Sequence, residues 1–251
     1  MTNEETIGKL NQMRLTAMAN AFREQMKNPA ISNLSFEERL GLLTDIEWSS
    51  RKNNRLRKLI KDAQFDQPNA HIGEINYTIE RKLDRSQIMT LASCSFISAN
   101  HNIIIMGAAG TGKSYLACAF GIEACKQFYS VRYIRLPDLL TDLAMARGEG
   151  SYRKLMKQFQ KINLLILDEW MLVSLKESEA RDLLEIIHNR HKRASTIFCS
   201  QFLPAGWHAK IGESTLADAI LDRIVHDSYT IELHSSQNEP SMREVYGLKS
   251  C

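Results

Sequence analysis

The sequence predicts an α/β fold in which a parallel β-sheet is flanked by helices and preceded by a small all-helical domain. Two observations support this prediction. Short apolar, β-branched segments alternate with helical segments after residue 101, which is typical of a parallel sheet covered on both faces. A glycine-rich motif stands between the first of these strands and the first helix. At 251 residues, the chain is long enough for one sizeable α/β core and a smaller module.

Shifts in residue pattern divide the chain into three predicted segments. We expect a helical N-terminal domain over residues 1–66, a connector over residues 67–101 and the α/β core over residues 102–251. Pro68 breaks the helical pattern where the connector begins. A helix is expected near residues 85–95, and it leads into the first strand of the core.

The N-terminal domain is expected to consist of successive helices. Apolar side chains recur at helical spacing from Leu10 to Met26, and Pro29 ends this run. Ser35 and Glu38 have the spacing of a capping box, which predicts the start of a further helix.

The core shows a regular order of strands and helices. Because strands that alternate with helices pair in parallel, the helices should cover both faces of one sheet. Strands are expected at residues 102–106, 131–135, 164–167, 196–200 and 229–233, and helices at 115–125, 137–145, 152–160, 177–192 and 216–225.

Residues 107–114 read GAAGTGKS, the G-x-x-x-x-G-K-S pattern of a phosphate-binding loop. Glycines let the backbone turn tightly, so that several N–H groups face the phosphates. Lys113 is expected to place a positive charge on the phosphates of ATP, and Ser114 to offer its hydroxyl to Mg²⁺. The residues expected to bind the nucleotide are Gly107, Ala108, Ala109, Gly110, Thr111, Gly112, Lys113 and Ser114.

Two carboxylates follow the apolar strand at residues 164–167. The carboxyl end of a parallel strand is where ligands bind in open α/β sheets. We expect Asp168 to hold Mg²⁺ through its water shell and Glu169 to polarise the water that attacks the γ-phosphate. An acidic cap at a strand end is the alternative explanation. The pair predicts ATP hydrolysis.

Two further residues are weaker candidates for catalysis. Gln201 follows the strand at 196–200 and is expected to hydrogen-bond the γ-phosphate or the water, although ordinary turn polarity also explains it. Arg223 follows an apolar helical stretch, from which an arginine can stabilise the transition state in a neighbouring subunit. The alternative for Arg223 is an ion pair within the chain, with Asp222 or Asp227.

Two segments carry basic residues without any acid among them. Six basic residues lie between positions 51 and 61, and four lie between positions 151 and 163. The phosphate backbone of DNA is the partner that we expect for both, and a solvated helix face is the alternative. The residues assigned to nucleic acid are Arg51, Lys52, Arg55, Arg57, Lys58, Lys61, Arg153, Lys154 and Lys157, and Lys161 lies in the second segment.

Taken together, the motifs GAAGTGKS, LLILDEW, STIFCSQ, TLADAILDRIVH and Ser241-Met242-Arg243 resemble the IstB family of transposition helper ATPases. This family belongs to the AAA+ superfamily, is encoded by bacterial insertion sequences and is similar to the helicase loader DnaC. The resemblance covers nearly the whole chain. One departure is Met171, where many members have a glycine.

This resemblance implies an AAA+ P-loop fold with a reduced lid. It also implies a homo-oligomer that assembles on double-stranded DNA. Sequence preference should be weak, because nothing in the sequence resembles a base-reading helix. Such an assembly would deliver target DNA to a partner transposase, or stimulate that transposase. The resemblance further implies that Arg223 acts on a neighbouring subunit and that Arg243 contacts the nucleotide from the lid.

Composition excludes several other classes of protein. The net charge of +3 is only mildly basic, and the five cysteines form no C-x-x-C pair, so neither a zinc site nor a disulfide framework is indicated. We expect reduced, buried thiols in a bacterial cytoplasmic protein, because the sequence shows no signal peptide and no membrane-spanning stretch.

Two other functions are compatible with a phosphate-binding loop in a sequence of this kind. A DnaC-like helicase loader is disfavoured by the TLADAILDRIVH stretch. A P-loop small-molecule kinase is disfavoured because the sequence shows no arginine-bearing lid and because Asp168-Glu169 suits water activation.

Overall fold

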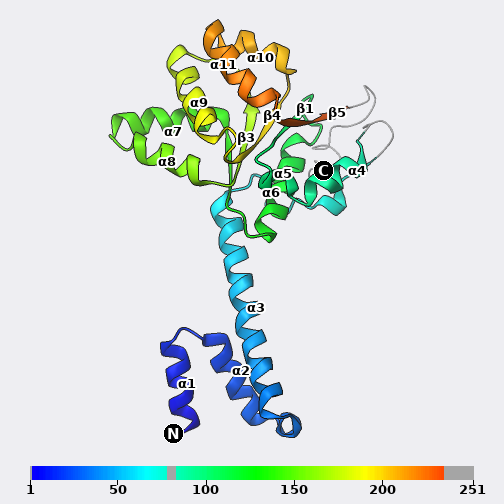
Figure 1. The fold of residues 1–251 in the computed structure, drawn as a ribbon, viewed down its shortest axis with the longest axis vertical. Coiled ribbons are helices and arrows are strands. Elements are labelled where there is room, and N and C mark those ends of the chain that lie inside the picture. Colours follow the sequence, from blue (N-terminus) through cyan, green and yellow to red (C-terminus); the bar gives the residue numbers. More distant parts are fainter. Residues whose placement is uncertain (1, 78–82, 235–251) are drawn as a thin grey trace, which may run out of the picture. The chain divides into compact units, whose positions relative to one another are not determined.

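The structure is a computed structural model that describes residues 2–77 and 83–234 (Figure 1). The chain divides into two compact units, Met1–Lys58 and Leu59–Cys251, and the division lies within the long helix α3 (Phe36–Ala63). The segment boundaries expected at residues 66 and 101 therefore stay predictions.

The N-terminal unit is helical and follows the predicted order. Helices α1 (Asn3–Gln12) and α2 (Thr16–Lys27) are followed by a 3₁₀ turn, η1 (Pro29–Asn33), and then by α3. The capping box is present, because the Ser35 hydroxyl accepts from the Glu38 N–H at 3.2 Å and the Glu38 carboxylate accepts from the Ser35 N–H at 2.8 Å.

A buried carboxylate on α3 caps α2. Glu47 accepts hydrogen bonds from the backbone N–H of Met18 at 3.0 Å and from Arg51 Nε at 2.7 Å. Leu15 stands at the N-cap of α2 and has no side-chain acceptor, so Glu47 supplies one. The hydrogen bond from Arg51 is the main reason that the pKa of Glu47 lies below its usual value.

The second unit is built on a five-stranded parallel sheet, as predicted. The strand order is β2-β3-β4-β1-β5, and every neighbouring pair is parallel. This order places β4, which precedes Gln201, between β3, which carries Asp168 and Glu169, and β1, which leads into the phosphate-binding loop. The bounds are β1 Asn102–Gly107, β2 Val131–Arg135, β3 Leu164–Trp170, β4 Ser195–Ser200 and β5 Ser228–Leu233.

Helices cover both faces of this sheet (Figure 1). Helix α6 packs on one face, against β1 to β4. On the other face, sheet residues such as Ile104, Leu167 and Phe198 form one core with side chains of α7 to α11. The bounds are η2 Ile72–Glu74, α4 Arg85–Ala92, α5 Ser95–Ser98, α6 Lys113–Lys126, α7 Leu136–Gly148, α8 Tyr152–Lys161, α9 Glu177–Arg190, α10 Pro204–Ile211 and α11 Ser214–Val225.

The structure differs from the sequence-based expectation in two places. Helix α10 was not predicted, because Pro204 and Gly206 are weak helix formers, but Trp207 and Ile211 are fully buried and hold it against the core. Strand β3 continues three residues beyond Leu167, through a bulge in its pairing with β4.

The described cysteines agree with the expectation of buried thiols. Cys94, Cys118, Cys125 and Cys199 are free and buried, and Cys251 lies outside the described residues. Burial raises the pKa of Cys94 to about 11 and that of Cys118 and Cys125 to about 12. Within residues 2–77 and 83–234, no helix combines the length and the apolar character needed to cross a membrane.

Candidate nucleotide-binding and catalytic site

The phosphate-binding loop joins β1 to α6, in the order that the motif requires. Two glycines are needed by the backbone. Gly112 precedes the helix with φ +93°, a conformation that glycine adopts readily. At Gly107, a Cβ atom would lie 2.5 Å from the carbonyl oxygen of Leu233 on β5, so only glycine allows this approach of the two strands.

Backbone carbonyls hold the loop lysine in the structure. Lys113 is almost fully buried and donates from Nζ to the carbonyls of Gly107 at 2.8 Å and Ala108 at 2.7 Å. The Thr111 hydroxyl also donates to Ala108 O, at 2.9 Å. A phosphate that enters this loop would compete with those two carbonyls for the ammonium group of Lys113.

The loop forms one wall of a pocket of about 830 Å³, a volume within the range of small-ligand sites. Residues from the connector, β2, β3 and the end of β4 form the other walls. The structure therefore brings loop residues 109–114, Asp168, Glu169 and Gln201 together around one cavity, while Gly107 and Ala108 do not line it. Lining residues outside the predicted set include Glu74, Ile75, Asn76, Leu83, Tyr133, Arg135 and Leu233.

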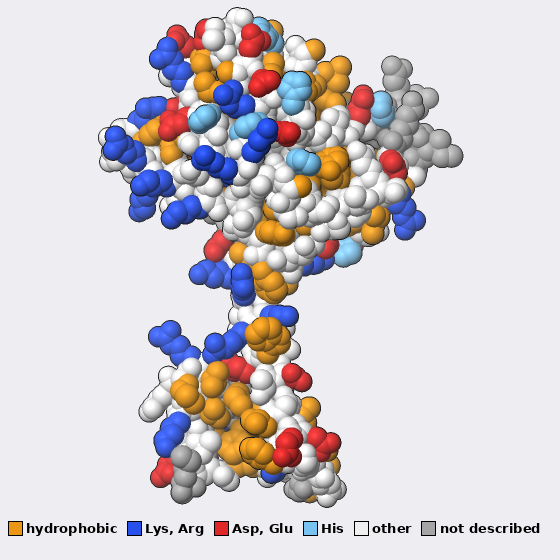
Figure 2. Space-filling view, in the orientation of Figure 1, with side chains coloured by type: hydrophobic (Ala, Val, Ile, Leu, Met, Phe, Trp, Pro, Cys, Tyr) orange, Lys and Arg blue, Asp and Glu red, His pale blue; other side chains and the backbone are white. Residues whose placement is uncertain are grey.

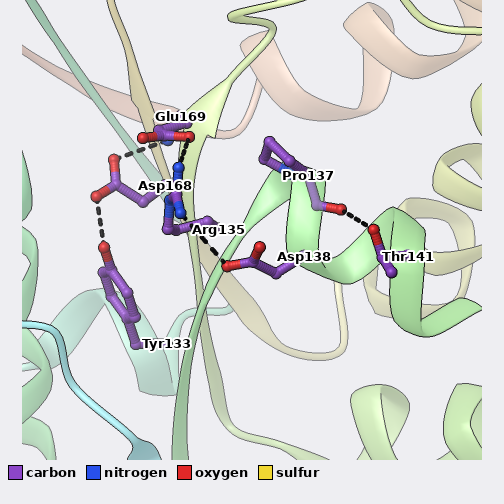
Figure 3. Close-up of polar contacts among 7 residues, drawn as sticks. All are labelled: Tyr133, Arg135, Pro137, Asp138, Thr141, Asp168 and Glu169. Atoms are coloured by element: carbon purple, nitrogen blue, oxygen red, sulfur yellow. Dashed lines mark hydrogen bonds and ion pairs between the residues drawn. The ribbon is translucent and has the colours of Figure 1, made fainter.

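Asp168 is buried at the carboxyl end of β3 and is held by two hydrogen bonds (Figure 3). The Tyr133 hydroxyl donates to Oδ2 at 2.6 Å, and the backbone N–H of Glu169 donates to Oδ1 at 2.8 Å. Burial, together with this bond to a carboxylate, raises the pKa of Tyr133, so the phenol stays protonated as a donor. Asp168 and the Ser114 hydroxyl are the oxygen donors that Mg²⁺ prefers.

Glu169 is bound by a cation from the neighbouring strand (Figure 3). Arg135 Nη2 lies 2.8 Å from Glu169 Oε2, and this hydrogen bond raises the pKa of Arg135. Arg135 Nη1 also lies 3.9 Å from Asp138 Oδ2, at the start of α7. The carboxylate that we expected to activate water is thus ion-paired in the structure.

The backbone at this strand end is unusual. Glu169 has φ +53° and Met171 has φ +55°, in the left-handed region that costs non-glycine residues roughly 1–2 kcal/mol each. Glu169 lies in the β3 bulge, a device that re-aims side chains next to active sites. Met171, the departure from the family pattern, is fully buried in a conformation that suits glycine.

Ser200, which precedes Gln201, fixes the neighbouring strand end. Its hydroxyl donates to Trp170 O at 2.9 Å and accepts from Trp207 Nε1 at 3.0 Å and from Phe202 N at 3.1 Å. Gln201 itself is exposed at the pocket wall and makes no hydrogen bond to the described residues.

Arg223 does not reach the pocket of its own chain. It lies in the last turn of α11, is partly buried and donates from Nη1 to Ala219 O at 2.6 Å. Among the described residues it forms no ion pair, so the alternative pairing with Asp222 or Asp227 is not observed. Arg243, with the rest of Ser241-Met242-Arg243, lies outside the described residues.

Comparison with known proteins identifies the family. The family of IstB-like ATP-binding proteins matches residues 8–245. The chain belongs to this family. An insertion sequence ATP-binding protein of Sinorhizobium fredii, y4pL, is 44% identical over 233 residues, which cover 93% of this chain and 95% of that protein. The ATP-binding protein of insertion sequence IS1162 from Pseudomonas fluorescens is 43% identical over 201 residues, covering 80% and 87%.

Solved structures confirm the predicted fold of this IstB-family protein. The DnaC helicase loader superposes with a TM-score of 0.55 at 18% identity, over 66% of this chain and 97% of that one. The replication initiator DnaA bound to AMPPCP and single-stranded DNA gives a TM-score of 0.58 at 22% identity, over 67% and 51%. The sequence-based assignments of the family and of the fold are therefore confirmed.

The basic residues of the IstB-family chain occupy two helices. Those between positions 51 and 61 are exposed on α3, where Arg51 is engaged with Glu47 and also donates to Arg14 O at 3.0 Å. Lys52 lies over the ring of Trp48, 4.9 Å from its centroid. The second set lies on α8 and is fully exposed: Arg153, Lys154, Lys157 and Lys161.

Proposed function

We propose that this IstB-family protein hydrolyses ATP and uses the nucleotide cycle to assemble on target DNA for a partner transposase. One observation carries the enzymatic part. Asp168 and Glu169 stand at the carboxyl end of β3, in the same pocket as the phosphate-binding loop. Relatives 40–44% identical are named as ATP-binding proteins of insertion sequences, which supports the role in transposition.

The residues around the pocket have distinct roles in this proposal. Lys113 binds the β- and γ-phosphates, while the loop N–H groups and the N-terminus of α6 add partial positive charge. Ser114 and Asp168 hold Mg²⁺, which neutralises charge on the phosphates when bound. Tyr133 keeps the carboxylate of Asp168 oriented toward this site.

Glu169 polarises the attacking water in the proposed reaction. Because Arg135 occupies the carboxylate that would face the water, the ion pair with Arg135 must open before Glu169 acts. Gln201, at the pocket wall, then orients the water or the γ-phosphate.

We assign Arg223 to the active site of a neighbouring subunit. Its side chain does not line its own pocket, and among residues 2–77 and 83–234 its one hydrogen-bond partner is the carbonyl of Ala219. An arginine supplied by a second subunit makes hydrolysis depend on assembly. The protein therefore acts as a homo-oligomer, in the cytoplasm of a bacterium. We keep Arg243 as a further nucleotide contact in this proposal.

Duplex DNA is the proposed scaffold for that assembly. The exposed cations on α3 and α8 bind phosphates and read no bases, so sequence preference should be weak. The solved DnaC helicase loader shares the fold at 18% identity, which supports no particular function.

Two measurements test the proposal together. Phosphate release from ATP should rise when duplex DNA is added, and no small-molecule acceptor should be needed. Transposition into a target duplex by the transposase of the same insertion sequence should require this protein and ATP. Phosphoryl transfer to a small acceptor, or transposition unchanged by the protein, would contradict it.

A further inference from the structure

Helices α8 and α9 lie side by side and run in the same direction. Near the start of α8, the Tyr152 hydroxyl donates to Asp182 at 2.8 Å and to Glu185 at 3.0 Å, both on α9. At the other end, the last turn of α8 contacts Arg190, the last residue of α9. The C-termini of the two helices therefore meet where β3 and β4 begin.

Arg190 joins these two helix ends from the interior. It is 2% exposed, and Nη1 donates to the carbonyls of Phe159 at 2.6 Å and Ile162 at 2.8 Å. Its other nitrogens donate to the hydroxyl of Thr196, at 3.1 Å, and to the carbonyl of Ser195. Carbonyls at a helix C-terminus carry partial negative charge, which offsets the buried guanidinium. Burial nevertheless lowers the pKa of Arg190 to about 9.

The turn that follows α9 carries two exposed cations, Lys192 and Arg193. Its shape is fixed by the carbonyl of Arg190, which accepts from Arg193 N at 2.9 Å and from Ala194 N at 3.0 Å. Lys192 has φ +57°, a position where glycine is the usual residue after a helix. Lys192, with its long cationic side chain, therefore stands at a position whose left-handed backbone favours glycine.

These cations extend the basic face of α8. Arg153, Lys157 and Lys161 recur at every fourth residue, about 6 Å apart along the helix axis. Lys161 is adjacent to Ile162, whose carbonyl Arg190 holds, so the row leads to the α9–β4 turn. Figure 2 shows Lys and Arg side chains gathered over the side of this unit where α7 and α8 lie. In the described structure, none of these five cations forms an ion pair.

The surroundings favour a nucleic acid over an acidic protein as the partner. Neither residues 151–163 nor residues 186–212 contain an acid, so α8 and the α9–β4 turn carry charge of one sign. The exposed carboxylate of Glu185 on α9 lies at the far end of this surface, against Tyr152 at the start of α8. Neither α8 nor the α9–β4 turn carries a large exposed hydrophobic side chain, among the described residues. Stable protein interfaces are anchored by buried apolar or aromatic residues, whereas binding to a phosphate backbone needs only cations.

We propose that Lys161, Lys192 and Arg193 form one phosphate-binding surface with the basic face of α8, and that this surface binds the backbone of duplex DNA. Arg190 is the positioning residue that sets the turn against α8. This inference rests on the proposed DNA-binding function. It adds to the DNA contacts proposed for helices α3 and α8 a further contact, made by the α9–β4 turn.

The test compares three variants of the full-length protein. Lys192→Gln/Arg193→Gln removes the turn cations, and Arg153→Gln/Lys154→Gln/Lys157→Gln removes three of the four cations of α8. Lys126→Gln/Arg181→Gln removes the same net charge as the first variant from other exposed positions, each in a surface ion pair of little energetic value. Fluorescence anisotropy with two duplexes of unrelated sequence measures affinity at several salt concentrations.

We expect the turn variant to bind both duplexes more weakly. The slope of log K against the logarithm of the salt concentration should become shallower by up to about 1.8, because two phosphate contacts are lost at about 0.9 each. The thermal midpoint of the turn variant and its ATP hydrolysis without DNA should match those of the wild type, as should the DNA affinity of the control variant. If the turn variant binds like the control while the α8 variant is impaired, the inference is overturned and the proposed function stands. If the wild type itself binds no duplex, the proposed function fails.

A double-mutant cycle tests the positioning role of Arg190. Arg190→Lys keeps the charge but loses the planar fork that reaches several carbonyls. If Arg190 acts by placing the turn, the loss of DNA affinity in Arg190→Lys and in Lys192→Gln/Arg193→Gln should be less than additive when combined. Fully additive losses in variants that keep a cooperative thermal transition would overturn this role.

Discussion

The guanidinium of Arg135 lies 2.8 Å from the carboxylate of Glu169, and the two residues lie at the carboxyl ends of adjacent strands of the sheet. Arg135 therefore occupies the carboxylate group of the residue to which we assign water activation. The ion pair also joins β2, which leads into α7 and α8, to the catalytic strand β3. A change on the α7–α8 side that draws Arg135 away would release Glu169, which would give the proposed DNA binding a physical route to the proposed hydrolysis.

Replacing Arg135 with alanine tests this route. Without the guanidinium, Glu169 is available to water at all times, so hydrolysis without DNA should rise and the stimulation by DNA should shrink. Stability should change little, because the Arg135 side chain is about half exposed. Steady-state phosphate release with and without duplex gives both quantities. A fall in hydrolysis to the level of a Glu169 variant would instead mean that Arg135 is required for the reaction.

Replacing Glu169 with glutamine should separate binding from turnover. The amide has nearly the same shape but cannot polarise water, so ATP should still bind while hydrolysis falls by about 10² or more. Binding is measured with a fluorescent ATP analogue, and turnover by phosphate release. Hydrolysis at the wild-type rate would show that Glu169 is not the base.

Replacing Lys113 with alanine should act on binding itself. A charge-assisted contact to phosphate contributes about 1.5–3 kcal/mol, so affinity for ATP should fall by roughly tenfold or more. The same fluorescent analogue measures this loss, and a thermal melt checks that the fold is kept. Unchanged affinity would remove Lys113 from the site.

Neutralising Arg55, Arg57, Lys58 and Lys61 together should weaken binding to all duplexes alike. The slope of affinity against salt should flatten by up to about four phosphate contacts. Arg51 is left unchanged, because its ion pair with Glu47 supports α2. If affinity and slope stay at their wild-type values, this part of α3 is a solvated face.

Mixing two inactive variants tests whether Arg223 acts between subunits. Arg223→Ala should retain ATP binding and lose hydrolysis by a factor of up to ~10³. Lys113→Ala should bind ATP too weakly for hydrolysis, but its Arg223 can still reach the site of a neighbouring subunit. In mixed oligomers some interfaces combine both intact halves, so activity should partly return. Failure to complement, once mixing is demonstrated by crosslinking, would place Arg223 in its own subunit or in a structural role.

Most of the fold follows from local sequence. Apolar strand segments such as Leu164–Leu167 and the loop Gly107–Ser114 have strong signals that depend on neighbours along the chain. Helix α10 has no such local signal, because its stability comes from burying Trp207 in a core made by elements distant in the sequence. The extension of β3 was missed for a similar reason, since its bulge depends on pairing with β4.

The sequence did not reveal the partners of the two candidate catalytic carboxylates. Tyr133 and Arg135 reach Asp168 and Glu169 only because β2 and β3 pair in parallel, with Arg135 opposite Asp168. Nothing near Tyr133 in the sequence indicates this register. The ion pair of Arg51 had a local signal, because Glu47 lies four residues earlier on the same helix.

Ser200 has a mechanical consequence for the two ends of the reaction. One hydroxyl links the carbonyl of Trp170, directly after Glu169, to the N–H of Phe202, directly after Gln201. A displacement of either segment is therefore passed to the other across a single side chain. We expect Gln201, proposed to contact the γ-phosphate, and Glu169, proposed to polarise the water, to move together when nucleotide binds.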